Sequence, residues 1–411
     1  KNTARLMNNF FSTLKKTCFF SLFFCAALVR PSAAQKSAAA AAPNAGLLKV
    51  TVPVEVSNGA VILTLKLNGS GRPLRLLFDT GADGMAVSQG LADSLGLKVS
   101  RKQQTSVVGG NMEISVSEGN TVHLGNFEVK NQSIAIFKEL HGGTDGLIGN
   151  VITKRYITKV DYDKKELSLY EPEGYQYEEG GQTIPVTSPA GLFILPGSLN
   201  IMPGKAKNGS FVFDTGAAYS LICFRPFVKQ NRLLVDGFKA IYNGSTTSMG
   251  VSTPTFTGRA FSFSFGKVME AKNLLVTLMS GGGTSENWNP GFDGSVGARL
   301  ISKYNFTINT RKMEIHLTPN HSYGYPADFV LGEYLVGFNE DGKLQVFDNI
   351  KFNTQAVLKP GCILETVNKV KSSELIHHPE KIEHLILAGA GAQYTVEYFK
   401  EGKLQKELIH K

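Results

Sequence analysis

The sequence predicts a mainly β protein made of two similar lobes, followed by a small unit that mixes helix and strand. One observation is the alternation of apolar and polar residues in 50–56 and 61–67, which is typical of half-buried strands. Asn58-Gly59 separates these runs as a turn. A second observation is an internal repeat, and a third is a change of pattern near the C-terminus, where a helix is expected around 379–388.

The repeat consists of two motifs that recur in the same order. Leu77-Phe78-Asp79-Thr80-Gly81-Ala82 returns as Val212-Phe213-Asp214-Thr215-Gly216-Ala217. Asp145-Gly146-Leu147-Ile148-Gly149 opens a segment that aligns without a gap on the one opened by Asp293-Gly294-Ser295-Val296-Gly297. Two motifs recurring together indicate two copies of one β-rich unit. We expect the lobes at 48–172 and 182–318, each ending in a short helical segment (151–156 and 299–304) and two hairpin strands.

Composition and charge restrict the class of partner. The chain has 42% hydrophobic and 19% charged residues, as folded domains do, and a formal net charge of +9. Five basic residues lie in the first 34 positions, so the remainder carries 38 basic and 34 acidic residues. That balance does not support binding to nucleic acid.

Residues 1–34 have the features of an export signal. Lys15-Lys16 precedes an apolar run at 18–29, and Ser32-Ala33-Ala34 places small residues before a cut at Gln35. The run is too short to span a bilayer, although Arg30-Pro31 before the cut leaves an uncleaved anchor as an alternative. Residues 35–47 then form an Ala-rich linker. We expect a periplasmic or extracellular protein without a stable membrane span after signal cleavage.

The cysteines and histidines indicate no disulfide framework and no metal site. Only Cys223 and Cys362 remain after the signal, and they are far apart in the chain. The eight histidines show no His-Glu-x-x-His spacing. No metal or organic cofactor is expected.

The repeated Asp-Thr-Gly is the candidate for chemistry. A strand would deliver each carboxylate, the glycine would let the backbone turn, and the threonine hydroxyl could hydrogen-bond across to the other lobe. One copy alone would be read as an ordinary turn. Two copies, each followed by an apolar-Gly segment, resemble the retropepsin and pepsin group of aspartic proteases over about residues 48–318.

This resemblance implies a bilobal acid protease fold with Asp79 and Asp214 as the catalytic pair. It assigns active-site support to the residues that follow each aspartate, namely Thr80, Gly81, Ala82, Thr215, Gly216 and Ala217. The two alanines make the retroviral type the closer likeness. Ser295 stands where the first lobe has Leu147, so looser packing is expected behind Asp214. Because both motifs are in one chain, the protein is expected to be monomeric.

A flap that covers the substrate is expected between the two motifs of lobe 1. The candidate residues are Val108, Gly109, Gly110 and Asn111, with an ordinary Gly-Gly hairpin as the alternative. A fainter counterpart in lobe 2 is expected around residues 242–245.

Residues 329–411 resemble a PDZ domain. Val336-Gly337-Phe338 matches its peptide-binding loop, and residues 357–368 match a later segment of that family. Cys362 replaces the usual Asp and Lys369 the usual Gly. The resemblance implies a small α/β PDZ-like domain that binds C-terminal peptides.

Together these features predict an exported aspartic endopeptidase that hydrolyses peptide or protein substrates with water activated by Asp79 and Asp214. The alternative is a non-catalytic peptide-binding or adaptor protein that uses the cleft and the PDZ-like unit. The presence of both aspartates favours the enzyme.

Overall fold

The computed structural model describes residues 44–140, 142–266, 269–281, 286–351, 353–387, 389 and 391–411. The predicted export signal at 1–34, and residues 35–43 of the predicted linker, lie outside these ranges. Within the described ranges, no helix is long and apolar enough to cross a membrane.

The first lobe is almost entirely β-structure, and its opening strands form where the sequence alternates. In β1 the buried valines alternate with exposed residues, and the turn to β2 has positive φ at both Asn58 (53°) and Gly59 (83°), as a tight hairpin requires. Its elements are η1 (Ala45–Leu47), β1 (Leu48–Ser57), β2 (Ala60–Leu67), β3 (Leu74–Phe78), β4 (Met85–Ser88), α1 (Gln89–Ser94), β5 (Arg101–Val107), β6 (Gly110–Leu124), β7 (Phe127–Phe137), β8 (Gly146–Ile148), β9 (Ile157–Asp161) and β10 (Glu166–Tyr170).

The second lobe repeats this order of strands. Its elements are β11 (Gln182–Pro185), η2 (Pro189–Gly191), β12 (Ile194–Asn200), β13 (Ala206–Asp214), β14 (Leu221–Cys223), α2 (Arg225–Gln230), β15 (Ala240–Ser248), β16 (Val251–Phe265), β17 (Met269–Met279), β18 (Gly294–Gly297), α3 (Ala298–Ile301), β19 (Tyr304–Asn309) and β20 (Glu314–Pro319).

The predicted repeat is visible in the strand register. Strand β3 pairs in parallel with β8, Leu77 opposite Leu147, and β13 pairs in parallel with β18, Val212 opposite Ser295. One expected detail is wrong, because residues 151–156 form turns rather than a helix. A short helix does form in the second copy, but as α3 it begins one residue before the expected 299.

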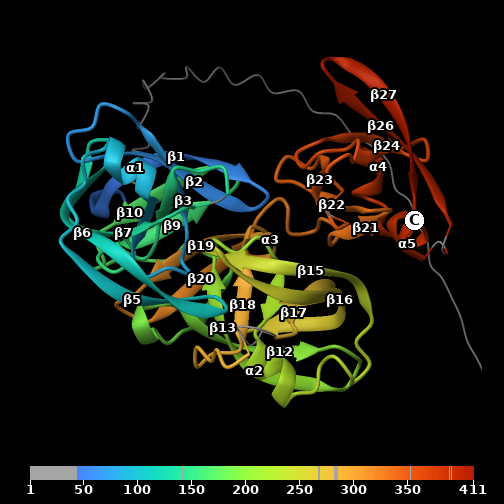
Figure 1. Ribbon diagram of the computed structural model, residues 1–411, viewed down its shortest axis with the longest axis horizontal. Helices are drawn as coiled ribbons and strands as arrows, with labels where there is room; N and C mark the ends of the chain where they lie inside the picture. The colour runs from blue at the N-terminus through green and yellow to red at the C-terminus, as the bar shows by residue number, and fades with distance from the viewer. Residues whose placement is uncertain are drawn as a thin grey trace, which may run out of the picture. The chain divides into compact units, whose positions relative to one another are not determined.

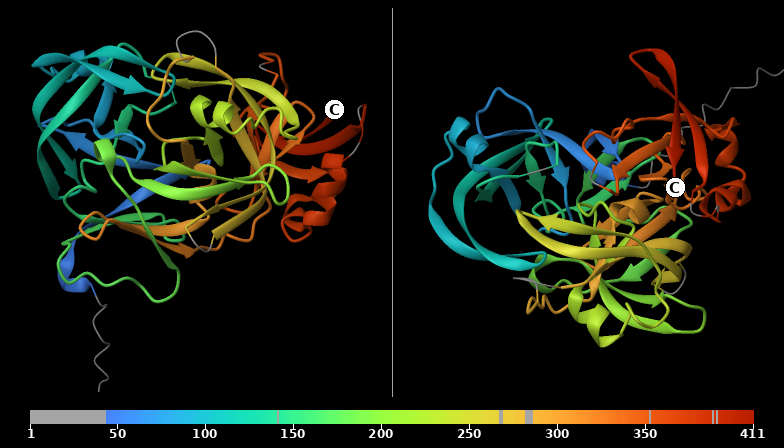
Figure 2. Two further views of the ribbon diagram at one scale, coloured as in Figure 1. Left: turned by 90° about the horizontal axis from the view of Figure 1, so that it is seen from below. Right: turned by 45° about the vertical axis from the view of Figure 1, so that its right-hand side comes forward.

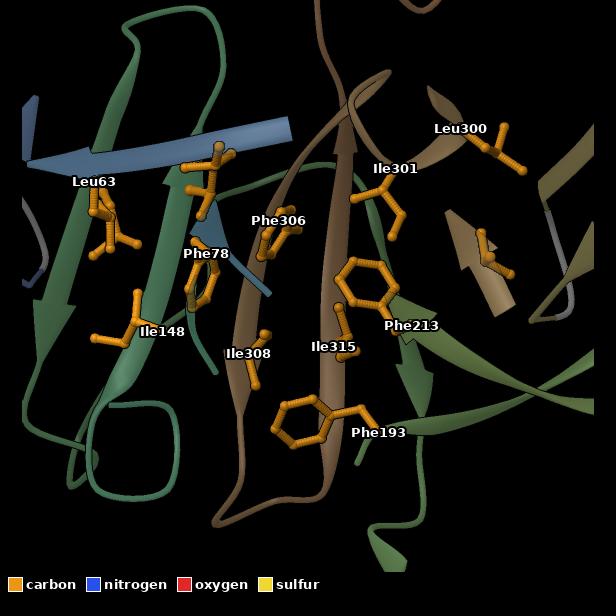
Figure 3. Close-up of a cluster of buried hydrophobic side chains, with 14 of the residues drawn as sticks. Leu63, Phe78, Ile148, Phe193, Phe213, Leu300, Ile301, Phe306, Ile308 and Ile315 are labelled. Atoms are coloured by element: carbon orange, nitrogen blue, oxygen red, sulfur yellow. The ribbon is translucent and has the colours of Figure 1, made fainter. Parts of the chain in front are cut away.

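The two lobes share one sheet. The hairpin β9–β10 of lobe 1 meets the hairpin β19–β20 of lobe 2, and β9 pairs antiparallel with β19, Val160 opposite Phe306. In this sheet the strands follow one another in the order β11-β20-β19-β9-β10-β1. Figure 1 labels β20, β19, β9, β10 and β1 of this series. A continuous cluster of buried side chains spans both lobes, and Phe213 packs on Phe306 within it at 5.2 Å between ring centroids (Figure 3).

The C-terminal unit has its own core and two small sheets. Its elements are β21 (Phe329–Leu331), β22 (Tyr334–Phe338), β23 (Leu344–Asn349), β24 (Leu364–Val367), β25 (Val370–Lys371), α4 (Ser372–Leu375), α5 (Pro379–Leu387), β26 (Gln393–Lys400) and β27 (Lys403–His410). The first sheet has the order β21-β22-β23 and the second β25-β24-β26-β27. Helix α5 covers the expected helical stretch, with Ile382 buried in the core of the unit.

A largely buried arginine of α3 connects lobe 2 to this unit. Arg299 forms an ion pair with Asp328 in which both side chains are only 10% exposed. Its guanidinium also lies 3.8 Å from the ring centroid of Phe347 and donates to the carbonyl of Phe338 at 3.3 Å. Such a pair stabilises the joint only while both partners are present, because either charge alone would be buried without compensation.

Candidate active site

The two aspartates lie at the ends of equivalent central strands. Asp79 directly follows β3, and its backbone N–H donates to the carbonyl of Ile148 at 3.0 Å. Asp214 is the last residue of β13, opposite Gly297 of β18. Each carboxylate therefore stands at the end of a strand that pairs in parallel with a strand carrying the repeated apolar-Gly motif.

The threonines tie the two loops together in a reciprocal way. The Thr80 hydroxyl donates to the carbonyl of Phe213 at 2.5 Å and accepts from the backbone N–H of Thr215 at 3.0 Å. The Thr215 hydroxyl donates to the carbonyl of Phe78 at 2.6 Å and accepts from the backbone N–H of Thr80 at 3.0 Å. Both threonines are fully buried, so these four bonds cannot be replaced by bonds to solvent. The predicted bonds across the lobes are present.

The glycines are needed because the opposite carboxylate lies against them. A Cβ added to Gly81 would lie 2.5 Å from Oδ1 of Asp214, and one added to Gly216 would overlap the carboxyl of Asp79. Each glycine N–H also donates to its own aspartate, Gly81 to Asp79 at 2.9 Å and Gly216 to Asp214 at 3.1 Å. The Ala217 N–H adds a second bond to Asp214 at 3.1 Å. The loops thus hold the two carboxyls face to face.

Burial shifts the pKa of both carboxyls upward, and the charge of Asp214 adds to the upward shift of Asp79. For Asp79, burial is the largest cause, followed by the charge of Asp214, and together they raise its pKa well above the usual range. For Asp214, burial also raises the pKa, but a hydrogen bond from Ser295 is the largest opposing influence. A hydrogen bond between the carboxyls raises the pKa of Asp79 and lowers that of Asp214. The pair therefore retains one proton into a higher pH range than two isolated carboxyls would.

Asn150 supports this site and was not identified from the sequence. Its side-chain N–H₂ donates to the carbonyls of Thr80 at 2.9 Å and Gly191 at 3.0 Å, which links the first loop to η2 of lobe 2. The residue follows Gly149 directly, but the corresponding position after Gly297 is Ala298, so the internal repeat gave no indication of its role.

The predicted flap residues form the tip of a long hairpin. Val108 and Gly109 join β5 to β6, with Val107 opposite Gly110 and a φ of 90° at Gly109. Asn111 continues into β6, opposite Ser106. These are the residues proposed from the sequence, and whether the hairpin moves stays a prediction.

Lobe 2 has a matching hairpin, but its tip lies elsewhere than expected. The strands β15 and β16 meet at Ser248 and Val251, and Met249 and Gly250 form the turn with φ of 48° and 87°. Residues 242–245, the expected counterpart, lie within β15 and pair with β16. The position expected for the second tip was therefore wrong.

The two hairpin tips meet and pack on opposite lobes. The position of a Cβ on Gly110 would be 3.5 Å from the Val251 side chain, and Figure 2 shows the two hairpins approaching each other. Met249 packs against buried residues of lobe 1 that include Ile114 and Leu147. Val108 packs against a cluster of lobe 2 made of Ile222, Phe224, Met279 and Trp288.

Trp288 is part of this second cluster and contacts the first hairpin. Its indole packs edge-on against Phe224 at 5.0 Å, and its Nε1–H donates to the Ser106 hydroxyl at 3.4 Å. It therefore connects the loop before β18 to the β5–β6 hairpin.

The residues of the predicted PDZ-like loop lie in β22. Val336 pairs with Phe329 of β21 on one side and with Val346 of β23 on the other. Phe338 pairs with Leu344 and accepts the hydrogen bond from Arg299. Part of this strand thus has both edges occupied within the chain.

Residues 63–151 match a family described as aspartyl protease. This span contains the first Asp-Thr-Gly, the β5–β6 hairpin and the apolar-Gly motif of lobe 1. Among solved structures, the chain is similar to the crystal structure of an aspartic proteinase from Irpex lacteus, with 16% sequence identity and a TM-score of 0.42 over 66% of this chain and 97% of that chain. No curated protein sequence matches the chain.

Proposed function

We propose that this aspartic-type endopeptidase hydrolyses peptide bonds with a water molecule held between Asp79 and Asp214. The observation that carries the proposal is the reciprocal set of threonine hydrogen bonds, which brings two equivalent Asp-Thr-Gly loops face to face. The family match over lobe 1 supports the same reaction class. An adaptor protein would need the cleft but not two carboxyls that share a proton.

The chemistry requires one carboxylate and one carboxylic acid at the same pH. The ionised partner removes a proton from water, which attacks the peptide carbonyl, and the protonated partner donates to the developing oxyanion. The raised pKa values of Asp79 and Asp214 support this arrangement, because a proton is then retained by the pair.

The substrates are peptides or proteins, and we expect cleavage between large apolar residues. The support is the pair of apolar clusters at the site, one containing Leu147 and Phe137 and the other Phe224 and Trp288. Side chains that pack against these clusters in place of the flap tips would bury apolar surface, which stabilises the bound substrate.

Export and a PDZ-like role for the C-terminal unit are the remaining parts of the proposal. Export is supported by the lysine pair, the apolar run and the Ala-rich cut site within residues 1–34. N-terminal sequencing of the mature protein should begin at Gln35, and an intact N-terminus would contradict cleavage. For the C-terminal unit, peptide binding along β22 would have to use the part of the strand beyond β21 or displace β21.

The test is cleavage of a diverse peptide pool by the purified mature chain, with cuts identified by mass spectrometry. A statine-type inhibitor should abolish the cuts. Asp79→Asn and Asp214→Asn should each reduce kcat/KM by at least about 10³-fold while leaving the circular dichroism spectrum unchanged, because either change removes half of the acid–base pair. Turnover near the wild-type rate in either variant, or no cuts by the wild type, would refute the proposed function.

A further inference from the structure

We propose that Ser295 fixes the division of labour in the pair, with its hydroxyl donating to Asp214 so that Asp214 is the ionised base and Asp79 the protonated acid. The inference rests on the proposed function, since it assigns roles within that reaction. Ser295 acts through Asp214 and is therefore a positioning residue. Nothing in its sequence context distinguished it from a packing irregularity.

The strand register places Ser295 beside Asp214. Strands β13 and β18 run in parallel with Val212 opposite Ser295. Side chains of paired residues point to the same face of a sheet, and residues two apart in a strand share a face. Asp214 therefore projects from the same face as Ser295, one diagonal step away. Ser295 is only 2% exposed, so its hydroxyl must find its partner inside the protein.

The equivalent position in lobe 1 has no donor. Strands β3 and β8 repeat the same register, with Leu77 opposite Leu147, so Leu147 has the same relation to Asp79 that Ser295 has to Asp214. Leu147 is an apolar side chain that packs in the lobe 1 cluster. The two lobes thus differ at the residue that flanks each carboxyl.

The backbone donors have the same imbalance. The carboxyl of Asp214 accepts from the backbone N–H groups of both Gly216 and Ala217, whereas within the described residues that of Asp79 accepts from one backbone N–H, of Gly81. With Ser295, Asp214 has three donors in its own lobe against one for Asp79. Donors to a carboxylate favour its ionised form, so the shared proton is held on Asp79.

Few charged groups near Asp214 influence which of the two carboxyls is ionised. The groups that act on the Asp214 carboxyl are Ser295, the two backbone amides and Asp79, of which only Asp79 titrates. Tyr219, on the turn that follows, is partly buried, which raises its pKa, and it is hydrogen-bonded to Thr246. The asymmetry in donors therefore decides which carboxyl ionises first.

The reaction then has a defined direction for each proton. Water forms its bond to the carbonyl carbon as one of its protons passes to Asp214, while the proton of Asp79 passes to the carbonyl oxygen. When the C–N bond breaks, Asp214 returns its proton to the leaving amine and Asp79 regains one from a hydroxyl of the intermediate. The products are a carboxylic acid and an amine, and the pair returns to its starting state.

An isosteric pair of variants tests the hydroxyl separately from the packing. Ser295→Thr keeps the hydroxyl donor. Ser295→Val introduces a side chain with nearly the shape of threonine but without the hydroxyl. We expect the acidic limb of the kcat/KM profile of Ser295→Val to lie about one pH unit above that of Ser295→Thr, because one hydrogen bond to a charged group is worth about that much. Coincident profiles from two active variants would overturn the proposal.

Chemical labelling of the wild type gives a second, independent measurement. An active-site-directed epoxide is opened by an ionised carboxylate, and peptide mapping of the resulting ester shows which aspartate reacted. We expect the label on Asp214, and a label on Asp79 would overturn the proposal even if Ser295→Val failed to fold. The mirror variant, Leu147→Ser with Ser295→Val, should move the label toward Asp79. Absence of peptide cleavage by the wild type would instead refute the proposed function, while the labelled position would still test the assignment.

Discussion

Replacing Thr80 with valine should loosen the contact between the two Asp-Thr-Gly loops. Valine has nearly the shape of threonine but lacks the hydroxyl, which donates to the carbonyl of Phe213 and accepts from the N–H of Thr215. The carbonyl of Phe213 and the N–H of Thr215 would then lack a hydrogen-bond partner inside the protein, where Thr80 and Thr215 are fully buried. At roughly 1–3 kcal/mol for each buried group without a partner, the free energy of unfolding should fall by about 2–6 kcal/mol.

The measurement is urea unfolding followed by circular dichroism, together with kcat/KM on a short peptide. Thr158→Val is the matched control, because Thr158 is also a fully buried threonine of a strand, and within the described residues its hydroxyl donates to one carbonyl, that of Tyr156 at 3.3 Å. The control should lower stability by about 1–3 kcal/mol. Thr80→Val should in addition lose activity, about 10²-fold, because the carboxyls would be misplaced. The reasoning is refuted if both variants have the same midpoint and the same activity.

Three further changes have expected outcomes. Gly216→Ala should abolish peptide cleavage in a folded protein, since the new methyl group would overlap the carboxyl of Asp79, and measurable turnover would contradict the close approach. Deleting 329–411 should leave cleavage of short peptides within about threefold of the full chain, because both Asp-Thr-Gly loops and both long hairpins precede this unit. A folded but inert deletion variant would show that the unit completes the site. Since the pKa values of Asp79 and Asp214 are raised, activity should peak in mildly acidic solution. The double variant Ala82→Ser, Ala217→Ser should move both limbs of the kcat/KM profile to lower pH, because a hydroxyl donor favours the ionised carboxylate. An unshifted profile with activity retained would refute that account.

The repeated motifs predicted the centre of the molecule because they specify geometry directly. A carboxylate at a strand end, a glycine beneath it and a threonine between them have one arrangement that satisfies all their buried groups. The hairpins that close the two lobes, β9–β10 and β19–β20, also repeat. Lys165 and Met313 occupy equivalent turns and share a positive φ, 54° and 52°, although neither residue type favours it.

The hairpin of lobe 2 shows where local turn chemistry misleads. Asn243-Gly244 has the composition of a tight turn, yet both residues lie within β15, and the turn itself is formed by Met249-Gly250. Long-range pairing with β16 and the contacts of Met249 with lobe 1 outweigh the local preference. Such contacts join residues that are distant in the sequence, so no local pattern records them.

The position of Ser295 beside a carboxylate could not be predicted from the sequence for a related reason. A serine in an otherwise apolar motif indicated a packing defect, and only the pairing of β13 with β18 shows that it flanks a carboxylate. Asn150 could not be found either, because its partners are backbone carbonyls that the sequence does not locate.

The difference between Leu147 and Ser295 also bears on why both halves are encoded in one gene. In an assembly of two identical subunits, symmetry places every residue at both halves of the site, so a mutation cannot alter one half alone. Here the two halves belong to one chain and are joined by the strand pairing of β9 with β19. Equivalent residues of the two halves are therefore encoded separately. A single base change can therefore alter the surroundings of one aspartate and leave the other as it was, and natural selection can act on each separately.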